Sequence, residues 1–130
     1  MSDGSIQGVL LTHGAMAQGM VDAVMKIAGA EESSLVPLSN DGVSPQVLID
    51  RLSELVGDRP AVIFTDLTSG SCAMTAQLTC RDNGQRAVVA GVNLPMLLDF
   101  VFHRDIPLAE LVPRLLERGR AGVRSIPAFE

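Results

Sequence analysis

Near its N-terminus the chain carries Ile6-Gln-Gly-Val-Leu-Leu-Thr12-His13-Gly14, an apolar run that stops at a histidine followed by a glycine. The run is too short for a helix, and its composition is typical of a strand covered on both faces. Gly14 offers a sharp exit into Ala15–Ala28, which we expect to be a helix. In open α/β sheets, ligands bind outside the carboxyl ends of the strands, so His13 is a candidate for chemistry. Taken alone, such a histidine is more often a surface or capping residue.

A second apolar run, Ala61–Asp66, also ends in an ionisable residue. The loop that follows, Leu67–Ser71, is small and rich in hydroxyl groups, and it opens a predicted helix that runs to about Cys80. Small residues let backbone N–H groups approach a ligand, and the N-terminus of a helix favours an anion. Asp66 and this loop are therefore the second part of a candidate site.

Strands and helices alternate along the rest of the chain. Further strands are expected at Ser34–Leu38 and at Arg86–Val92, and Pro37 suggests that the first of these lies at an edge of the sheet. Further helices are expected from Pro45 to Gly57, from Asn93 to about Arg104 and over Leu108–Leu116. Pro113 interrupts the last helical pattern, so we expect a kink or a late start there. Val123–Ala128 alternates like a short strand, either an antiparallel edge or a strand that pairs with another chain. In the first helix, the side chains expected to pack on the sheet are Met16, Met20, Val24 and Ile27.

This alternation predicts one domain over residues 1–130, an α/β fold with a doubly wound, mostly parallel five-stranded sheet. We expect the flavodoxin-like order 2-1-3-4, completed by an antiparallel C-terminal strand. In that order, the topological switch lies between the strands that end in His13 and Asp66. A carboxylate beside an imidazole can hold one ring N–H and leave the other nitrogen free as a nucleophile. With Ser71 and the loop amides forming an anion pocket, the arrangement fits phosphoryl transfer onto histidine, and it also permits other chemistry.

Several classes of protein do not fit the sequence. A net charge of −5, with no Trp and no Tyr, argues against nucleic acid and against an anionic membrane surface as partners. The glycine-rich signatures of P-loop and dinucleotide-binding proteins are absent. A receiver domain would carry an acidic pair where Thr12-His13 stands. A metal site on His13 and Asp66 would need a third ligand, and none is evident at the strand ends, so we expect neither a metal nor a cofactor.

The remaining reactive side chains have ordinary interpretations. Cys72 and Cys80 lie about 12 Å apart along one predicted helix, too far for a disulfide, and we interpret both as packing residues in a reducing compartment. His103 lies near the C-terminal end of its helix, where a cation suits the helix dipole, and we assign it no catalytic role. Without a signal peptide or a membrane-spanning run, the protein is expected to be cytoplasmic.

Four segments match a known pattern in the same order: Thr12-His13-Gly14, Thr65-Asp66-Leu67 with Gly70-Ser71, Ala90-Gly-Val-Asn-Leu-Pro-Met-Leu97, and Gly119-Arg-Ala-Gly122. In these segments the chain resembles the mannose-type enzyme IIA domain of the phosphoenolpyruvate-dependent sugar phosphotransferase system. The resemblance implies a homodimer that exchanges its C-terminal strand, here Val123–Ala128. It also implies a histidine that is phosphorylated by the phosphocarrier HPr and dephosphorylated by an enzyme IIB domain.

By position, the resemblance implies that His13 is the phosphoacceptor and that Asp66 orients it. It assigns phosphoryl binding to the loop residues Thr68, Ser69, Gly70 and Ser71. The loop Thr68–Met74 departs from the aromatic-containing or Phe-Gly-Gly-Ser-Pro type usual in the family, which leaves open a regulatory phosphorelay protein that binds a signalling target. A second alternative is an oligomeric scaffold that kept the fold and lost transfer. We expect enzyme IIB and the membrane subunits to be separate chains.

Overall fold

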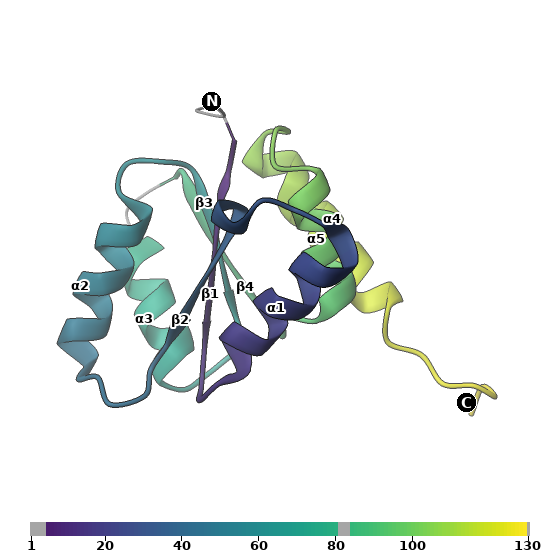
Figure 1. The fold of residues 1–130 in the computed structure, drawn as a ribbon, viewed down its shortest axis with the longest axis horizontal. Helices are drawn as coiled ribbons and strands as arrows, with labels where there is room; N and C mark the ends of the chain where they lie inside the picture. The colour runs from purple at the N-terminus through teal and green to yellow at the C-terminus, as the bar shows by residue number, and fades with distance from the viewer. Residues whose placement is uncertain (1–4, 81–83, 130) are drawn as a thin grey trace.

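The computed structural model describes residues 5–80 and 84–129. The described residues form one sheet of four parallel strands, in the order β2-β1-β3-β4 (Figure 1). This arrangement confirms the parallel order 2-1-3-4 expected from the sequence. The strands are β1 (Gln7–Thr12), β2 (Leu35–Ser39), β3 (Ala61–Thr65) and β4 (Arg86–Ala90).

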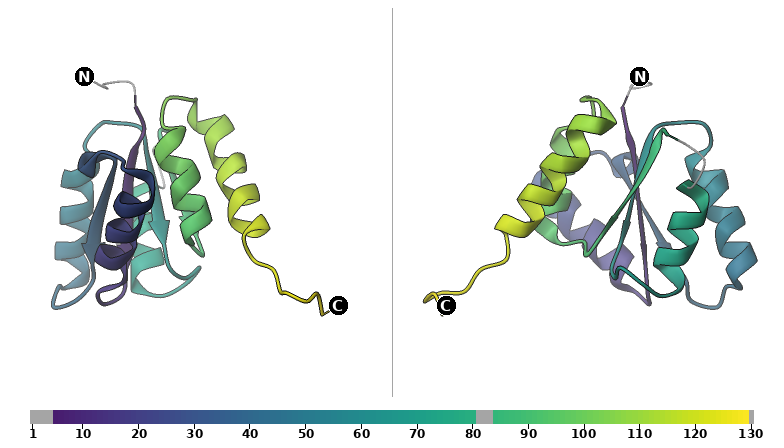
Figure 2. Two further views of the ribbon diagram at one scale, coloured as in Figure 1. Left: turned by 45° about the vertical axis from the view of Figure 1, so that its right-hand side comes forward. Right: turned by 180° about the vertical axis from the view of Figure 1, so that it is seen from behind.

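Helices cover both faces of the sheet, as Figures 1 and 2 show. α2 and α3 pack on one face, while α1 and α4 pack on the other, with α5 lying against α4. The helices are α1 (Met16–Ala28), the short 3-10 turn η1 (Glu32–Ser34), α2 (Pro45–Val56), α3 (Ser71–Cys80), α4 (Leu94–Phe102) and α5 (Leu108–Ala121). No helix in the described ranges is both long and apolar enough to cross a membrane.

The two central strands are buried on both faces because their side chains alternate between two hydrophobic clusters. In β1, Leu10 belongs to the cluster under α1, α4 and α5, whereas Val9 and Leu11 belong to the cluster under α2 and α3. All three side chains are fully buried. The apolar run that opens the chain is therefore continuous, because a parallel strand between two helical layers has no polar face.

Two side-chain caps predicted from the sequence are formed. The Ser44 hydroxyl accepts a hydrogen bond from the Val47 N–H, at 3.3 Å, at the start of α2. The Asn93 side chain accepts one from the Met96 N–H, at 3.1 Å, at the start of α4. At the other end of α4, His103 caps the helix, and its Nδ1 lies 2.8 Å from the Asp99 carbonyl oxygen. These contacts set where the helices begin and end.

The packed face of α1 differs from the expected one. Met16 and Ile27 are 41% and 63% exposed, and the buried side chains are Ala17, Val21 and Val24. Hydrophobicity alone favours Met16 over Ala17, but the small Ala17 lies on the face that meets the sheet. Side chains of adjacent helix residues point about 100° apart, so the buried face of α1 begins at Ala17 and not at Met16 as expected.

The expected late start of the last helix is also wrong. α5 begins at Leu108 and continues through Pro113 to Ala121. Pro113 and Ala109 are both exposed. Pro113 has no N–H to donate to the carbonyl oxygen of Ala109, four residues earlier in the helix. Because Ala109 is exposed, water can donate that hydrogen bond instead. The helix packs through Leu111 and Leu115, which are fully buried.

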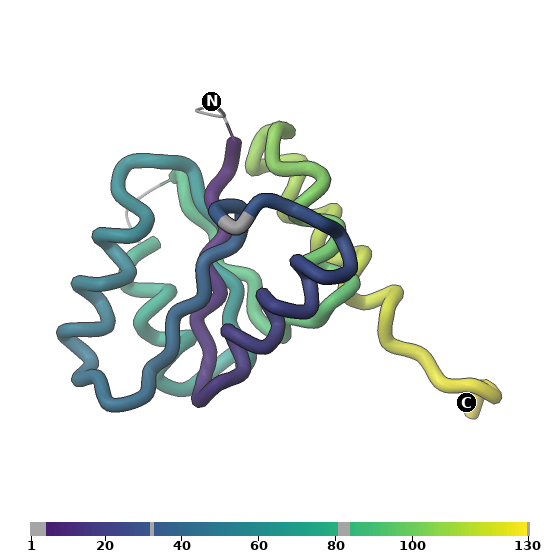
Figure 3. Tube along the Cα trace, in the orientation of Figure 1, coloured from purple at the N-terminus to yellow at the C-terminus, as the bar shows by residue number. Residues whose placement is uncertain are grey.

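The C-terminal segment, residues 122–129, extends away from the body of the protein (Figures 2 and 3). It contains no strand, and its large apolar side chains are exposed: Val123 by 75%, Ile126 by 83% and Phe129 by 81%. A strand needs a neighbour for its backbone hydrogen bonds, and the fifth strand expected from the sequence is not formed among the described residues.

Gly8 allows β1 to approach the ring of Phe100 from α4. A Cβ at position 8 would clash with that ring and would lie 3.0 Å from a Leu35 methyl group. The Phe100 ring also packs edge-to-face on Phe64, with ring centroids 5.2 Å apart. Since this contact lies in the middle of the larger hydrophobic cluster, no side chain larger than hydrogen fits at position 8 without displacement of the ring.

We predict that Gly8→Ala lowers the free energy of unfolding by about 1–3 kcal/mol, the usual cost of overpacking a core. Gly19→Ala in α1 is the matched control, because a Cβ there meets nothing within 4 Å. The control variant should be as stable as the wild type or more stable, since alanine is the better helix former. Urea denaturation measures both. Equal stability of Gly8→Ala and the wild type would contradict the packing described for Phe100.

Candidate functional site

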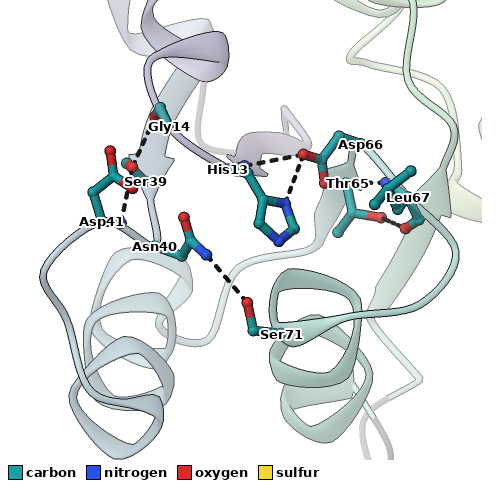
Figure 4. Close-up of polar contacts among 9 residues, drawn as sticks. All are labelled: His13, Gly14, Ser39, Asn40, Asp41, Thr65, Asp66, Leu67 and Ser71. Carbon is teal, nitrogen blue, oxygen red and sulfur yellow. Dashed lines mark hydrogen bonds and ion pairs between the residues drawn. The ribbon is translucent and has the colours of Figure 1, made fainter.

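His13 and Asp66 meet at the carboxyl ends of the neighbouring strands β1 and β3 (Figure 4). The His13 backbone N–H donates a hydrogen bond to Asp66 Oδ2, at 3.0 Å, and the ring nitrogen Nδ1 lies 2.8 Å from the same oxygen. The other carboxylate oxygen accepts a hydrogen bond from the Leu67 N–H, at 3.0 Å. One carboxylate therefore holds both the backbone and the ring of His13.

This geometry determines which ring nitrogen of His13 is free. An ionised carboxylate only accepts hydrogen bonds, so the Nδ1 facing Asp66 carries the proton in the neutral ring. The other nitrogen, Nε2, then keeps its lone pair. The His13 side chain is 43% exposed, whereas that of Asp66 is 11% exposed. The arrangement presents an oriented, accessible nitrogen nucleophile above a partly buried carboxylate.

The pKa of Asp66 shows that its ionised form is stabilised. Burial by itself would raise the pKa of this carboxyl, but the hydrogen bonds from the backbone and ring of His13, and the charge that the ring can carry, outweigh burial. The pKa of Asp66 is therefore lowered from its ordinary value. At neutral pH the Asp66 carboxylate is thus ionised and accepts a hydrogen bond from the Nδ1–H of His13.

Gly70 brings the loop after β3 next to the His13 ring. Its φ of +99° lies in the region that L side chains rarely adopt. A Cβ built there would lie 3.9 Å from His13 Nε2, an ordinary contact distance, so the glycine is required by backbone conformation and not by lack of space. The loop thus passes beside the nitrogen that Asp66 leaves free.

The other predicted loop residues lie at the same end of the sheet. Ser71 is the first residue of α3, and its hydroxyl accepts a hydrogen bond from the Asn40 amide, at 3.2 Å. Thr68 and Ser69 are exposed. Within the described ranges, neither of them forms a hydrogen bond with His13 or Asp66. The structure therefore places Gly70 beside the His13 ring and ties Ser71 to Asn40, while Thr68 and Ser69 form the outer part of the loop.

Asn40 lies beside the predicted site but was not singled out from the sequence. Cys72 was interpreted as a packing residue, and its full burial in the cluster under α2 and α3 confirms that interpretation. Asn40 follows the edge strand β2, and Figure 4 shows its side chain extending toward Ser71. The available signal was its place at the carboxyl end of a strand adjacent to β1, where ligands bind in such sheets. Cys72 lies in the first turn of α3, away from the strand ends where a third ligand was sought.

The Cys72 side chain lies close to the His13–Asp66 pair. One potential metal-binding atom from each of these three residues lies within 4.8 Å of the other two. Cys72 is fully buried, and burial, together with the nearby charge of Asp66, raises the pKa of its thiol. Cys72 and Cys80 are both free thiols, in agreement with the absence of a disulfide expected from their spacing. The donor set is a nitrogen, an oxygen and a sulfur.

Comparisons with known proteins show the family of the chain. A family model, EIIA-man, described as "PTS system fructose IIA component", matches residues 7–113. The mannose-specific EIIAB component of the phosphotransferase system of Escherichia coli K12 is 29% identical over 92% of this chain and 39% of its own length. The chain thus spans about two fifths of that curated relative.

Two solved structures share the fold over nearly their full length. The phosphotransferase component EIIA from Streptococcus agalactiae superposes with a TM-score of 0.87 at 23% identity, covering 94% of this chain and 98% of that one. The mannose/sorbose-specific IIA subunit from Enterococcus faecalis gives a TM-score of 0.83 at 24% identity, covering 97% and 98%. The chain belongs to the mannose-type IIA family of the sugar phosphotransferase system.

We predict that Asp66→Asn is less stable than the wild type at neutral pH and that this difference disappears in acid. The pKa of Asp66 is lower in the folded protein than the value of about 4 expected in the unfolded chain. Its stabilising contribution is therefore fully present above about pH 4 and is lost as the pH falls through the folded-state pKa.

Urea denaturation of both proteins, from about pH 6 down to about pH 2, measures the difference in free energy of unfolding. Comparing the two proteins cancels the contributions of the other carboxylates. A difference that stays constant over this range would contradict the described role of the carboxylate.

Proposed function

We propose that this protein is a phosphocarrier in sugar uptake, which accepts a phosphoryl group on His13 from phospho-HPr and passes it to an enzyme IIB domain. The observation that carries the proposal is the contact between His13 Nδ1 and Asp66 Oδ2, at 2.8 Å. Family membership supports the type of reaction. The pair supplies an oriented nucleophile and the group that keeps it in the reactive tautomer.

In the proposed step, the lone pair of His13 Nε2 attacks the phosphorus atom of the donor. A new N–P bond forms while the bond between phosphorus and the donor breaks, and the donor leaves with the electron pair of that bond. The Nδ1 proton stays on His13, where Asp66 accepts its hydrogen bond and stabilises the positive charge that the ring gains during attack. Transfer to the enzyme IIB domain is the reverse step on a different acceptor.

The loop beside His13 is proposed to bind the three phosphoryl oxygens. Its members are Thr68, Ser69, Gly70 and Ser71, and the last of these opens α3, a helix of 10 residues. Backbone N–H groups at a helix N-terminus have no partners within the helix, and the helix dipole favours negative charge there. Phosphoryl transfer depends chiefly on such positioning and charge stabilisation, because the protein supplies little covalent chemistry.

We also propose that the protein is a homodimer that exchanges its C-terminal segment, residues 123–129. Three large apolar side chains of this segment are exposed in the single chain, which supports a partner for it. A groove of about 480 Å³ lies between α4 and α5, beside the residue where the segment begins. In the dimer, each segment would pair as an antiparallel strand with the partner chain.

Labelling with phosphoenolpyruvate, enzyme I and HPr tests the phosphoacceptor. We predict an acid-labile phosphohistidine that is lost in His13→Ala. The chain contains two histidines, so His103→Ala is the matched control, and it should keep the label. Label retained in His13→Ala, or lost only in His103→Ala, would contradict the assignment. Failure of the wild type to accept phosphate from HPr would favour the scaffold alternative.

Deletion of residues 123–130 tests the dimer. If the segment is exchanged, its removal deprives each chain of the strand that pairs across the interface, and the truncated protein should sediment as a monomer. Circular dichroism of the truncated protein should be retained, because residues 123–129 contribute no helix or strand to the fold of the single chain. An unchanged sedimentation profile would argue against strand exchange.

A further inference from the structure

Cys72 adds a third metal-binding side chain to His13 and Asp66. We propose that these three residues form a binding site for a thiophilic divalent cation, of which Zn²⁺ fits best. The three side chains come from the end of β1, the end of β3 and the first turn of α3. Their potential ligand atoms lie within 4.8 Å of one another. The fold thus brings the ring nitrogen of His13 close to a carboxylate oxygen and a thiol sulfur that follow more than 50 residues later.

The number and type of these donors match zinc chemistry. Zn²⁺ takes Cys, His and Asp ligands, and three protein ligands with one open position for water are typical of its accessible sites. Mg²⁺ and Ca²⁺ prefer six or more oxygen ligands, so a thiol and an imidazole select against them. The mixed donor set therefore favours a soft or borderline cation over the abundant hard ones.

The spacing requires only a small adjustment. Zinc bond lengths of about 2.0–2.3 Å place tetrahedral ligand atoms roughly 3.3–3.6 Å from each other. Ligand atoms that are up to 4.8 Å apart must therefore move about 1 Å closer together to bind one ion. If Nδ1 is the ligand, its 2.8 Å distance from Asp66 Oδ2 must increase slightly. His13 is the member able to move, because its side chain is 43% exposed, whereas Asp66 is 11% exposed and Cys72 is fully buried.

Metal binding at this site is coupled to the loss of one proton from Cys72. The thiolate is the form of cysteine that binds a metal, so binding of Zn²⁺ to Cys72 releases the thiol proton to solvent. The sulfur–zinc bond replaces the sulfur–hydrogen bond, and no oxidant or reductant takes part. Affinity should therefore increase with pH, as it does for other sites that include a cysteine ligand.

The consequence for transfer rests on the proposed function. A cation bound through Nε2 occupies the nitrogen that is to attack phosphorus. A cation bound through Nδ1 takes the lone pair of that nitrogen, so the ring proton moves to Nε2, which then has no lone pair for attack. Both ring nitrogens lead to the same outcome, so a bound cation and phosphorylation of His13 exclude each other. The site would make phosphocarrier activity sensitive to free zinc.

Cobalt serves as a spectroscopic probe that does not depend on phosphotransfer. Co²⁺ titrated into the reduced full-length protein should give a near-ultraviolet thiolate-to-cobalt charge-transfer band, which Zn²⁺ should then displace. Cys72→Ser should abolish the band and lower the affinity for Zn²⁺ by roughly 10–100-fold or more. Substitution of a residue that only hydrogen-bonds to a metal ligand already lowers affinity by about 10–100-fold. Cys80→Ser is the matched control, because Cys80 is the other cysteine and lies outside the three-residue cluster. It should keep the band.

The proposal is overturned if the wild type gives no band, if Cys72→Ser keeps it, or if Cys80→Ser loses it. Circular dichroism of each variant separates loss of a ligand from loss of the fold. In a second measurement, Zn²⁺ should slow labelling of the wild type and of Cys80→Ser by HPr, each relative to its own rate without zinc. A positive cobalt result with no labelling of the metal-free wild type would refute the phosphocarrier proposal and leave the metal site standing.

Discussion

The arrangement of the site depends on one carboxylate oxygen, Asp66 Oδ2, which faces both the backbone N–H and the ring of His13. The backbone contact ties the end of β1 to the end of β3, and the ring contact sets the direction of the imidazole. Because both contacts use the same oxygen, the position of the strand end and the orientation of the side chain are coupled. A histidine without such a partner would rotate freely and would populate both tautomers.

The rest of the fold serves to bring these strand ends together. Parallel strands in the order β2-β1-β3-β4 put the carboxyl ends of β1 and β3 side by side, with α1 and α3 leaving on opposite faces of the sheet. The hydrophobic clusters on the two faces hold the strands in register. Asn40 follows the neighbouring edge strand and contacts Ser71, and the loop with Gly70 passes beside the His13 ring. These strand ends lie at the topological switch point of the sheet, the place where open α/β sheets bind ligands.

Much of this arrangement could be predicted from the sequence, because it depends on local signals. Continuous apolar runs indicated β1 and β3, the caps at Ser44 and Asn93 marked two helix starts, and the residues that end the two runs pointed to the site. Features that depend on three-dimensional packing were not predictable in the same way. The buried face of α1 required knowing how closely Ala17 meets the sheet. The position of Cys72 depends on the direction in which α3 leaves the loop, and no strand among the described residues pairs with the C-terminal segment.

We propose that Asp66 keeps the proton on Nδ1 and leaves Nε2 of His13 to carry the phosphoryl group. Nuclear magnetic resonance of the phosphorylated protein, with its histidines labelled in ¹⁵N, tests this directly through the coupling between phosphorus and the bonded nitrogen. We predict coupling to Nε2 of His13, with the Nδ1 proton still present. Coupling to Nδ1 of His13, or to either nitrogen of His103, would contradict it.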